Sequence, residues 1–138
     1  MKKILIDNEY LTYTLEAEGS YKGFDLKVTH VIYKEKGKGF ASDFIINGWR
    51  CGYVKVEDIL DRIPFDENKS QLDWFLKNIE CDREIDFINV LPHIDPDNKY
   101  IGFACDHLFD TVDKCTTIYC TKECEKIIDQ LIDFINNK

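Results

Sequence analysis

The C-terminal segment carries the pattern that most narrows the possible folds of this chain. Apolar residues recur there on one side of a helix: Cys120, Cys124, Ile127, Ile128, Leu131 and Ile135. This spacing predicts an amphipathic helix from about Thr117 to Asn136. Because such a helix is apolar on one face alone, the rest of the chain must supply the surface that it covers.

The first half of the chain has the two-residue alternation of strands instead. Strands are predicted over residues 10–18, 24–33, 42–46 and 49–56. Gly19 and Ser20 are expected to form the turn between the first two strands. Asn47 and Gly48 predict a hairpin between the last two, because both positions tolerate positive φ. This half therefore predicts an antiparallel sheet of three to five strands.

The middle of the chain has a different character. Residues 56–63 have helical spacing that stops at Pro64, and Ser70 can cap a second short helix. Residues 84–90 and 100–105 are predicted as further strands, with 92–99 as a loop. The sequence thus predicts a single α+β domain over residues 1–138, with an antiparallel sheet, two short middle helices and a long amphipathic C-terminal helix.

Composition excludes several classes of protein. The 138 residues carry 18 Lys and Arg against 26 Asp and Glu, a net charge of −8, whereas nucleic-acid binding needs a positive surface. The acidic residues concentrate between Glu57 and Asp86, mostly on an expected solvated face. No apolar run approaches the roughly 20 residues of a membrane span, and the run after Met1 is too short for a signal peptide. We expect a cytoplasmic protein with reduced cysteines and no cofactor.

Cysteine and histidine offer two candidate sites. Four residues could supply metal ligands: His107, Cys115, Cys120 and Cys124. Their spacing lacks the Cys-x2-Cys pair of common zinc sites, so buried core positions are favoured for the thiols. Cys105 and His107 lie two residues apart at the end of a predicted strand, where they would share a face as nucleophile and base. No oxyanion loop accompanies them, so a buried thiol is the favoured alternative.

Arg50 is one of three arginines, against fifteen lysines. It lies between Trp49 and Tyr53, and a guanidinium beside aromatic rings can hold a small anion or a nucleotide base. The alternative, favoured on physical grounds, is that Trp49, Cys51 and Tyr53 share one face of a strand in the core. Arg50 would then point to solvent.

Three segments of the chain resemble a family of small, uncharacterised phage- and prophage-encoded proteins. Residues 50–54, RCGYV, match one motif of the family, and residues 102–110, GFACDHLFD, are similar to its GFDCAHxGD strand. Residues 123–131, ECEKIIDQL, are similar to the ECExLAxQL run of its last helix. The family's GHP loop is replaced, and residues 86–90 read DFINV where the family has HGG. The resemblance implies a phage origin and, since half the motif residues are absent, a binding role rather than catalysis.

Together these observations predict a phage accessory protein, in the cytoplasm of the bacterial host, that counters host defence by sequestering a small nucleotide-type ligand. The expected ligand-binding residues are Trp49, Arg50, Tyr53, Cys105, His107 and Asp110. Two alternatives stay open: an acidic inhibitor of a nucleic-acid-binding host protein, and a hydrolase that uses Cys105 and His107. Neither nucleic acid nor a membrane is an expected partner, and a homo-oligomer is a further open alternative.

Overall fold

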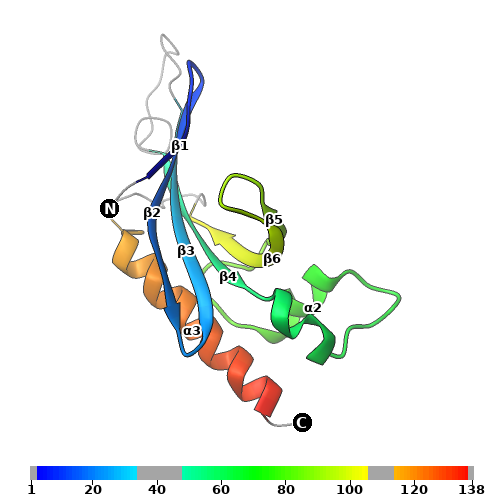
Figure 1. Ribbon diagram of the computed structural model, residues 1–138. Coiled ribbons are helices and arrows are strands. Elements are labelled where there is room, and N and C mark those ends of the chain that lie inside the picture. Colours follow the sequence, from blue (N-terminus) through cyan, green and yellow to red (C-terminus); the bar gives the residue numbers. More distant parts are fainter. Residues whose placement is uncertain (1–2, 34–47, 106–113, 137–138) are drawn as a thin grey trace.

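The computed structural model describes residues 3–33, 48–105 and 114–136. The elements within these ranges are β1 (Lys3–Asp7), β2 (Leu11–Tyr21), β3 (Phe24–Tyr33), β4 (Trp49–Lys55), η1 (Glu57–Arg62), α2 (Gln71–Asn78), β5 (Phe87–Leu91), β6 (Asp95–Ala104) and α3 (Thr117–Asn136). The strands form one curled antiparallel sheet in the order β1-β2-β3-β4-β6-β5 (Figure 1). The predicted α+β class and antiparallel sheet are confirmed.

β2 and β3 form a long hairpin whose turn lies later than predicted. Gly19 and Ser20 belong to β2 and pair with Leu26 and Asp25 of β3, so the prediction of a turn there is wrong. The chain reverses instead at Lys22 and Gly23, with φ values of 50° and 88°. Two successive residues with positive φ are what a tight two-residue hairpin requires, and the Gly-Ser pair did not reveal which dipeptide would adopt them.

Two other connections bear on the predicted strands. The segment 42–46 and Asn47 lie outside the described residues, whereas Gly48 has a φ of 68° and packs so closely on the Val31 carbonyl that a Cβ would overlap it. β5 and β6 are joined by residues 92–94 alone, because β6 begins at Asp95. The loop predicted over 92–99 is therefore too long.

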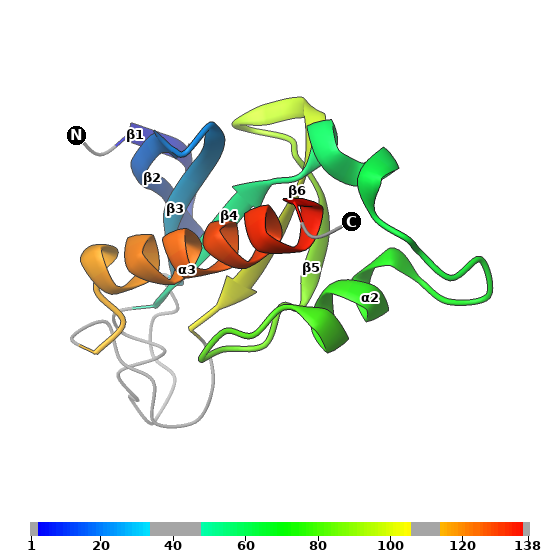
Figure 2. The same cartoon turned by 90° about the horizontal axis from the view of Figure 1, so that it is seen from below.

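α3 lies across one face of the sheet and packs against β2, β3 and β4 (Figure 2). Its predicted bounds are confirmed, and its stripe is buried at Cys120, Cys124, Ile127, Ile128 and Leu131. From the sheet, the core receives Leu26, Val28, Val54, Ile101 and Phe103. The close packing depends on Gly52, where a Cβ would overlap the Phe103 ring and lie 3.0 Å from the Cys124 Sγ.

The middle segment closes the end of the core. η1 is a 3₁₀ helix, so the first predicted helix is shorter and tighter than an α-helix. The second is confirmed: the Ser70 Oγ accepts a hydrogen bond of 3.1 Å from the backbone N–H of Asp73 and caps α2. Trp74 in α2 meets Phe134 in α3 edge to face, with ring centroids 4.8 Å apart.

Within residues 3–33, 48–105 and 114–136, no helix combines the length and the apolar character that crossing a bilayer requires.

Candidate functional site

β4 carries three of the six predicted ligand-binding residues, Trp49, Arg50 and Tyr53, but it does not place them on one face. Side chains alternate between the two faces of a strand, and Arg50 lies on the face that α3 covers. Trp49 and Tyr53 lie on the opposite face. The structure therefore separates the guanidinium from the two aromatic rings, and these three side chains do not line one pocket.

Arg50 does not point to solvent either. Its Nε donates to the Glu16 carboxylate at 2.5 Å, and its Nη1 donates to the Cys115 carbonyl at 3.0 Å. The Arg50 side chain is 14% exposed and the Glu16 side chain only 2%. The Thr117 hydroxyl donates to the same Glu16 oxygen at 3.0 Å, and the His30 Nδ1 lies 3.6 Å from the other oxygen. We call Glu16, His30, Arg50 and Thr117 the polar cluster.

The polar cluster joins three strands to the start of α3. Glu16 lies on this face by alternation, because Thr14 pairs with His30 and His30 pairs with Arg50. The register of β2 against β3 shifts between Leu15 and Ala17, so Glu16 is the extra residue of a β-bulge and Ala17 takes the position opposite Val28. The sequence alternation placed Glu16 among the polar residues of β2 and gave no sign of the bulge. Since a buried carboxylate neutralises Arg50, this guanidinium is a structural group rather than a ready anion site.

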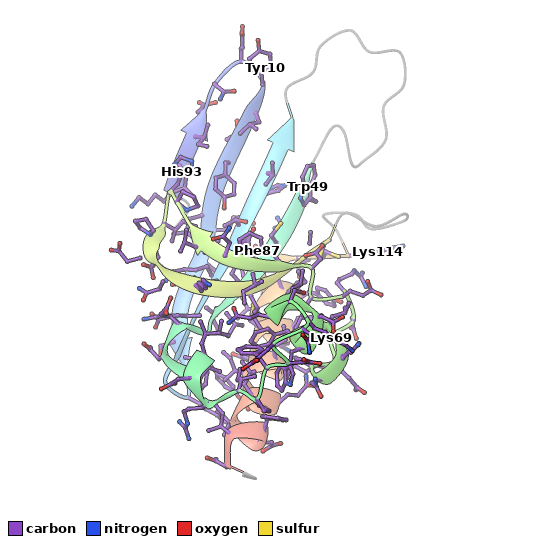
Figure 3. The ribbon with its side chains drawn as sticks, turned by 90° about the vertical axis from the view of Figure 1, so that its right-hand side faces the viewer. Tyr10, Trp49, Lys69, Phe87, His93 and Lys114 are labelled. Atoms are coloured by element: carbon purple, nitrogen blue, oxygen red, sulfur yellow. The ribbon has the colours of Figure 1, made fainter. Side chains whose placement is uncertain are left out.

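The opposite face of the sheet carries aromatic side chains. Tyr53 meets Phe87 with ring centroids 5.3 Å apart, and Tyr13 meets His93 at 6.5 Å, both edge to face. Figure 3 shows Trp49, Phe87 and His93, the last at the turn between β5 and β6. Burial is the main cause that raises the pKa of the Tyr53 hydroxyl, and the neighbouring Cys51 adds to it. The Tyr13–His93 and Tyr53–Phe87 pairs connect this face of β2 and β4 to the β5–β6 hairpin, which is the curled end of the same sheet.

Cys105 is the one member of the predicted Cys–His pair that the structure describes, since His107 and Asp110 lie outside the described residues. Cys105 is only 3% exposed, and its Sγ lies 3.9 Å from the Cys120 Sγ. The hydrogen bond with Cys120, followed by burial, raises the pKa of Cys105. A nucleophilic cysteine needs a lowered pKa and access to substrate, so the Cys105 environment favours a thiol at rest.

Three further thiols behave as core residues. Cys115, Cys120 and Cys124 are each buried, as the core interpretation of the sequence predicted. The Cys124 Sγ donates to the Tyr53 carbonyl at 3.7 Å, and Arg83 Nη2 donates to the Cys115 Sγ at 3.5 Å. Across the part of the chain that the structure describes, no three His, Cys, Asp or Glu side chains gather as a metal site.

A cavity of about 320 Å³ lies elsewhere, between the β2–β3 turn, η1 and the C-terminal end of α3. Its apolar wall is formed by Phe24, Ile59, Ile132 and Ile135. Its charged residues are Asp25, Lys55, Asp58 and Arg62. Sequence reasoning missed this cavity because its walls come from three distant segments, and only the scarcity of arginine could have drawn attention to Arg62.

In comparisons with known proteins, no protein-family model, no curated protein and no solved structure matches the chain. Function is therefore inferred from the side-chain geometry described above.

Proposed function

We propose that this chain is a non-enzymatic binding protein that sequesters a small nucleotide-type ligand in the cavity between η1 and the end of α3. The observation that carries the proposal is the two-sided chemistry of this cavity, with an apolar wall and the cations Lys55 and Arg62. A nucleotide combines a flat, largely apolar base with an anionic phosphate. The volume of about 320 Å³ falls at the lower end of the range of small-molecule sites.

The charges around the cavity favour a ligand of low charge. Lys55 is 20% exposed and lies 3.5 Å from the carboxylate of Asp58, which is 80% exposed. A hydrated carboxylate of this kind holds its partner weakly, so a phosphate can share the Lys55 ammonium. Asp25 and Asp58 offset the two cations and would repel a highly charged polyphosphate. Nucleoside monophosphates and cyclic nucleotides therefore suit the cavity better than triphosphates.

The setting of the proposal comes from the sequence resemblance. A phage accessory protein in the host cytoplasm can counter host defence by holding a signalling nucleotide away from its receptor. The buried, raised-pKa thiol of Cys105 supports binding rather than covalent catalysis. The binding residues proposed here, Lys55, Arg62 and the apolar wall, replace Trp49, Arg50 and Tyr53, which the sheet separates.

Isothermal titration calorimetry with AMP, GMP and the cyclic mono- and dinucleotides tests the proposal on the full chain. We expect at least one of them to bind, and Lys55→Met and Ile132→Trp to weaken binding at least tenfold. Ile132→Trp fills the cavity without altering its charge. Lys77→Met is the matched control, because Lys77 also pairs with a nearby carboxylate, Asp73 at 3.2 Å, but lies on α2 away from the cavity.

The result that refutes the proposal is the absence of heat and of any shift in melting temperature with every nucleotide. Equal binding by wild type, Lys55→Met and Ile132→Trp would place the ligand elsewhere and would also contradict it.

A second candidate function rests on the charge of the middle segment. Residues 57–86 hold ten acidic and four basic side chains, a net of −6 within a chain of net −8. Eight of these ten acids are exposed. Such a surface can cover the basic face of a nucleic-acid-binding protein, and long-range attraction would make association fast and salt-sensitive. A pull-down that recovers a basic partner at low salt and loses it at high salt supports this candidate, and salt-insensitive binding contradicts it.

A further inference from the structure

We propose that Cys105 and Cys120 are a site of oxidative modification, at which an external low-molecular-weight disulfide converts the two thiols into one intramolecular disulfide. The pair joins the end of β6 to the beginning of α3, beside the polar cluster. The proposal is independent of the ligand cavity, which lies at the opposite, C-terminal end of α3.

The geometry of the two sulfurs carries the inference. They lie 3.9 Å apart, and both residues are buried, Cys105 at 3% and Cys120 at 0% exposure. A disulfide holds its sulfurs at about 2.05 Å, so they must approach by a further ~2 Å. Each thiol has staggered χ1 rotamers to draw on, so this approach does not require a different fold.

Competing thiols are held in other contacts. Cys124 donates to the Tyr53 carbonyl, and Cys115 accepts a hydrogen bond from Arg83. Cys115 also lies within hydrogen-bond contact of Cys105, which makes it the closest rival for the bridge. We favour Cys120 as the partner because its Sγ lies 3.9 Å from the Cys105 Sγ and it belongs to the first turn of α3.

The exchange balances as two successive displacements. Because both thiols are buried, the exchange proceeds when this end of the core opens locally. One exposed cysteine then loses its proton to solvent, and its thiolate attacks a glutathione-type disulfide to form a mixed disulfide and release one thiolate. The second cysteine, also deprotonated, attacks the protein sulfur of that mixed disulfide and releases the second thiolate. Both released thiolates take up the protons, so two cysteine sulfurs are oxidised and the external disulfide is reduced to two thiols.

The bridge would link the end of β6 covalently to the start of α3. Two hydrogen bonds of Arg50 lie beside this link: the Cys105 N–H donates to the Arg50 carbonyl at 2.9 Å, and Arg50 Nη1 donates to the Cys115 carbonyl at 3.0 Å. A covalent link there removes conformations from the unfolded chain. We therefore expect the oxidised protein to unfold at a higher urea concentration than the reduced protein.

Thiol counting and peptide mapping test the proposal on the full chain. The protein is equilibrated in graded mixtures of reduced and oxidised glutathione, quenched with acid, unfolded and alkylated. We expect two of the six cysteines to resist alkylation together, and a non-reducing digest to yield the 105–120 cross-link. Cys105→Ser and Cys120→Ser should each abolish the protection from alkylation. Cys124→Ser should retain it, although Cys124 is as buried on α3 as Cys120.

Three outcomes overturn the proposal. It is wrong if all six thiols stay alkylatable at the most oxidising mixture, if the cross-link maps to Cys105 and Cys115, or if only glutathione adducts form. The mapping uses the wild-type chain, so the test stands even where a serine variant does not fold.

Discussion

The polar cluster makes a sharp prediction for the stability of the fold. Replacing Arg50 with Met leaves the Glu16 carboxylate, 2% exposed, without the guanidinium that neutralises it. It also removes the donor to the Cys115 carbonyl. Breaking one side of a buried ion pair costs about 3–5 kcal/mol, because an uncompensated charge stays in the interior.

This loss is large for a domain of ordinary stability, which is about 5–15 kcal/mol. With a urea m-value of about 2 kcal/mol/M, the unfolding midpoint should fall by about 1.5–2.5 M. The double variant Glu16→Met with Arg50→Met removes both charges together. It should lose clearly less than the sum of the two single variants, because no charge is left buried alone.

Urea unfolding followed by circular dichroism measures these differences. Lys27→Met is the matched control, since Lys27, 11% exposed, pairs across the same hairpin with Glu18, which is 59% exposed and stays hydrated after the substitution. A pair with one partner so open to water contributes about 1 kcal/mol at most. The reasoning is refuted if Arg50→Met costs no more than Lys27→Met, or if the two single effects simply add. If Arg50→Met does not fold, Arg50→Lys should give an intermediate loss.

Three further substitutions test packing, capping and surface charge. Gly52→Ala should destabilise by about 1–3 kcal/mol in urea, because its Cβ overlaps the Phe103 ring; an unchanged midpoint would mean that the ring is free to move. Ser70→Ala should cost about 1 kcal/mol by removal of the α2 cap, whereas Ser70→Asp should cost little. The hydrogen bond from Lys126 holds the pKa of Asp82 below its usual range. Asp82 therefore stabilises the fold above its unfolded value of about 3.9, and this contribution is lost as the pH falls through its folded pKa. Asp82→Asn should narrow the difference in melting temperature between pH 6 and pH 3, and an unaltered difference would contradict the pairing.

The sequence predicted elements wherever periodicity alone decides the structure. The stripe of α3 fixed its bounds, and the hydroxyl of Ser70 located the start of α2. Prediction failed where one residue changes the register. A bulge at Glu16 places Ala17 opposite Val28 and so reverses the alternation of β2 beyond it, and the turn at Lys22 and Gly23 lies three residues beyond the Gly-Ser pair. Both depend on how neighbouring strands pair, which alternation does not encode.

The candidate site shows the same limit. Trp49, Arg50 and Tyr53 are close in sequence, and the pleat of β4 alone places Arg50 on one face and the two aromatic residues on the other. The groups that do converge come from distant segments: Glu16, Arg50 and Thr117 in the polar cluster, or the cavity walls from β3, η1 and α3. No local motif announces contacts of that kind.

The order of the strands has a consequence for how this chain can change. The acidic segment, residues 57–86, connects β4 to β5. At its start the Val56 N–H donates to the Lys99 carbonyl, and at its end the Asp86 N–H donates to the Gly102 carbonyl. Its two ends are thus hydrogen-bonded to opposite edges of the single strand β6, at positions three residues apart. The segment therefore leaves the sheet beside β6 and returns beside the same strand, with its inner side in the core and its outer side in water. Substitutions on its outer side can change the net charge of the molecule without altering any strand pairing.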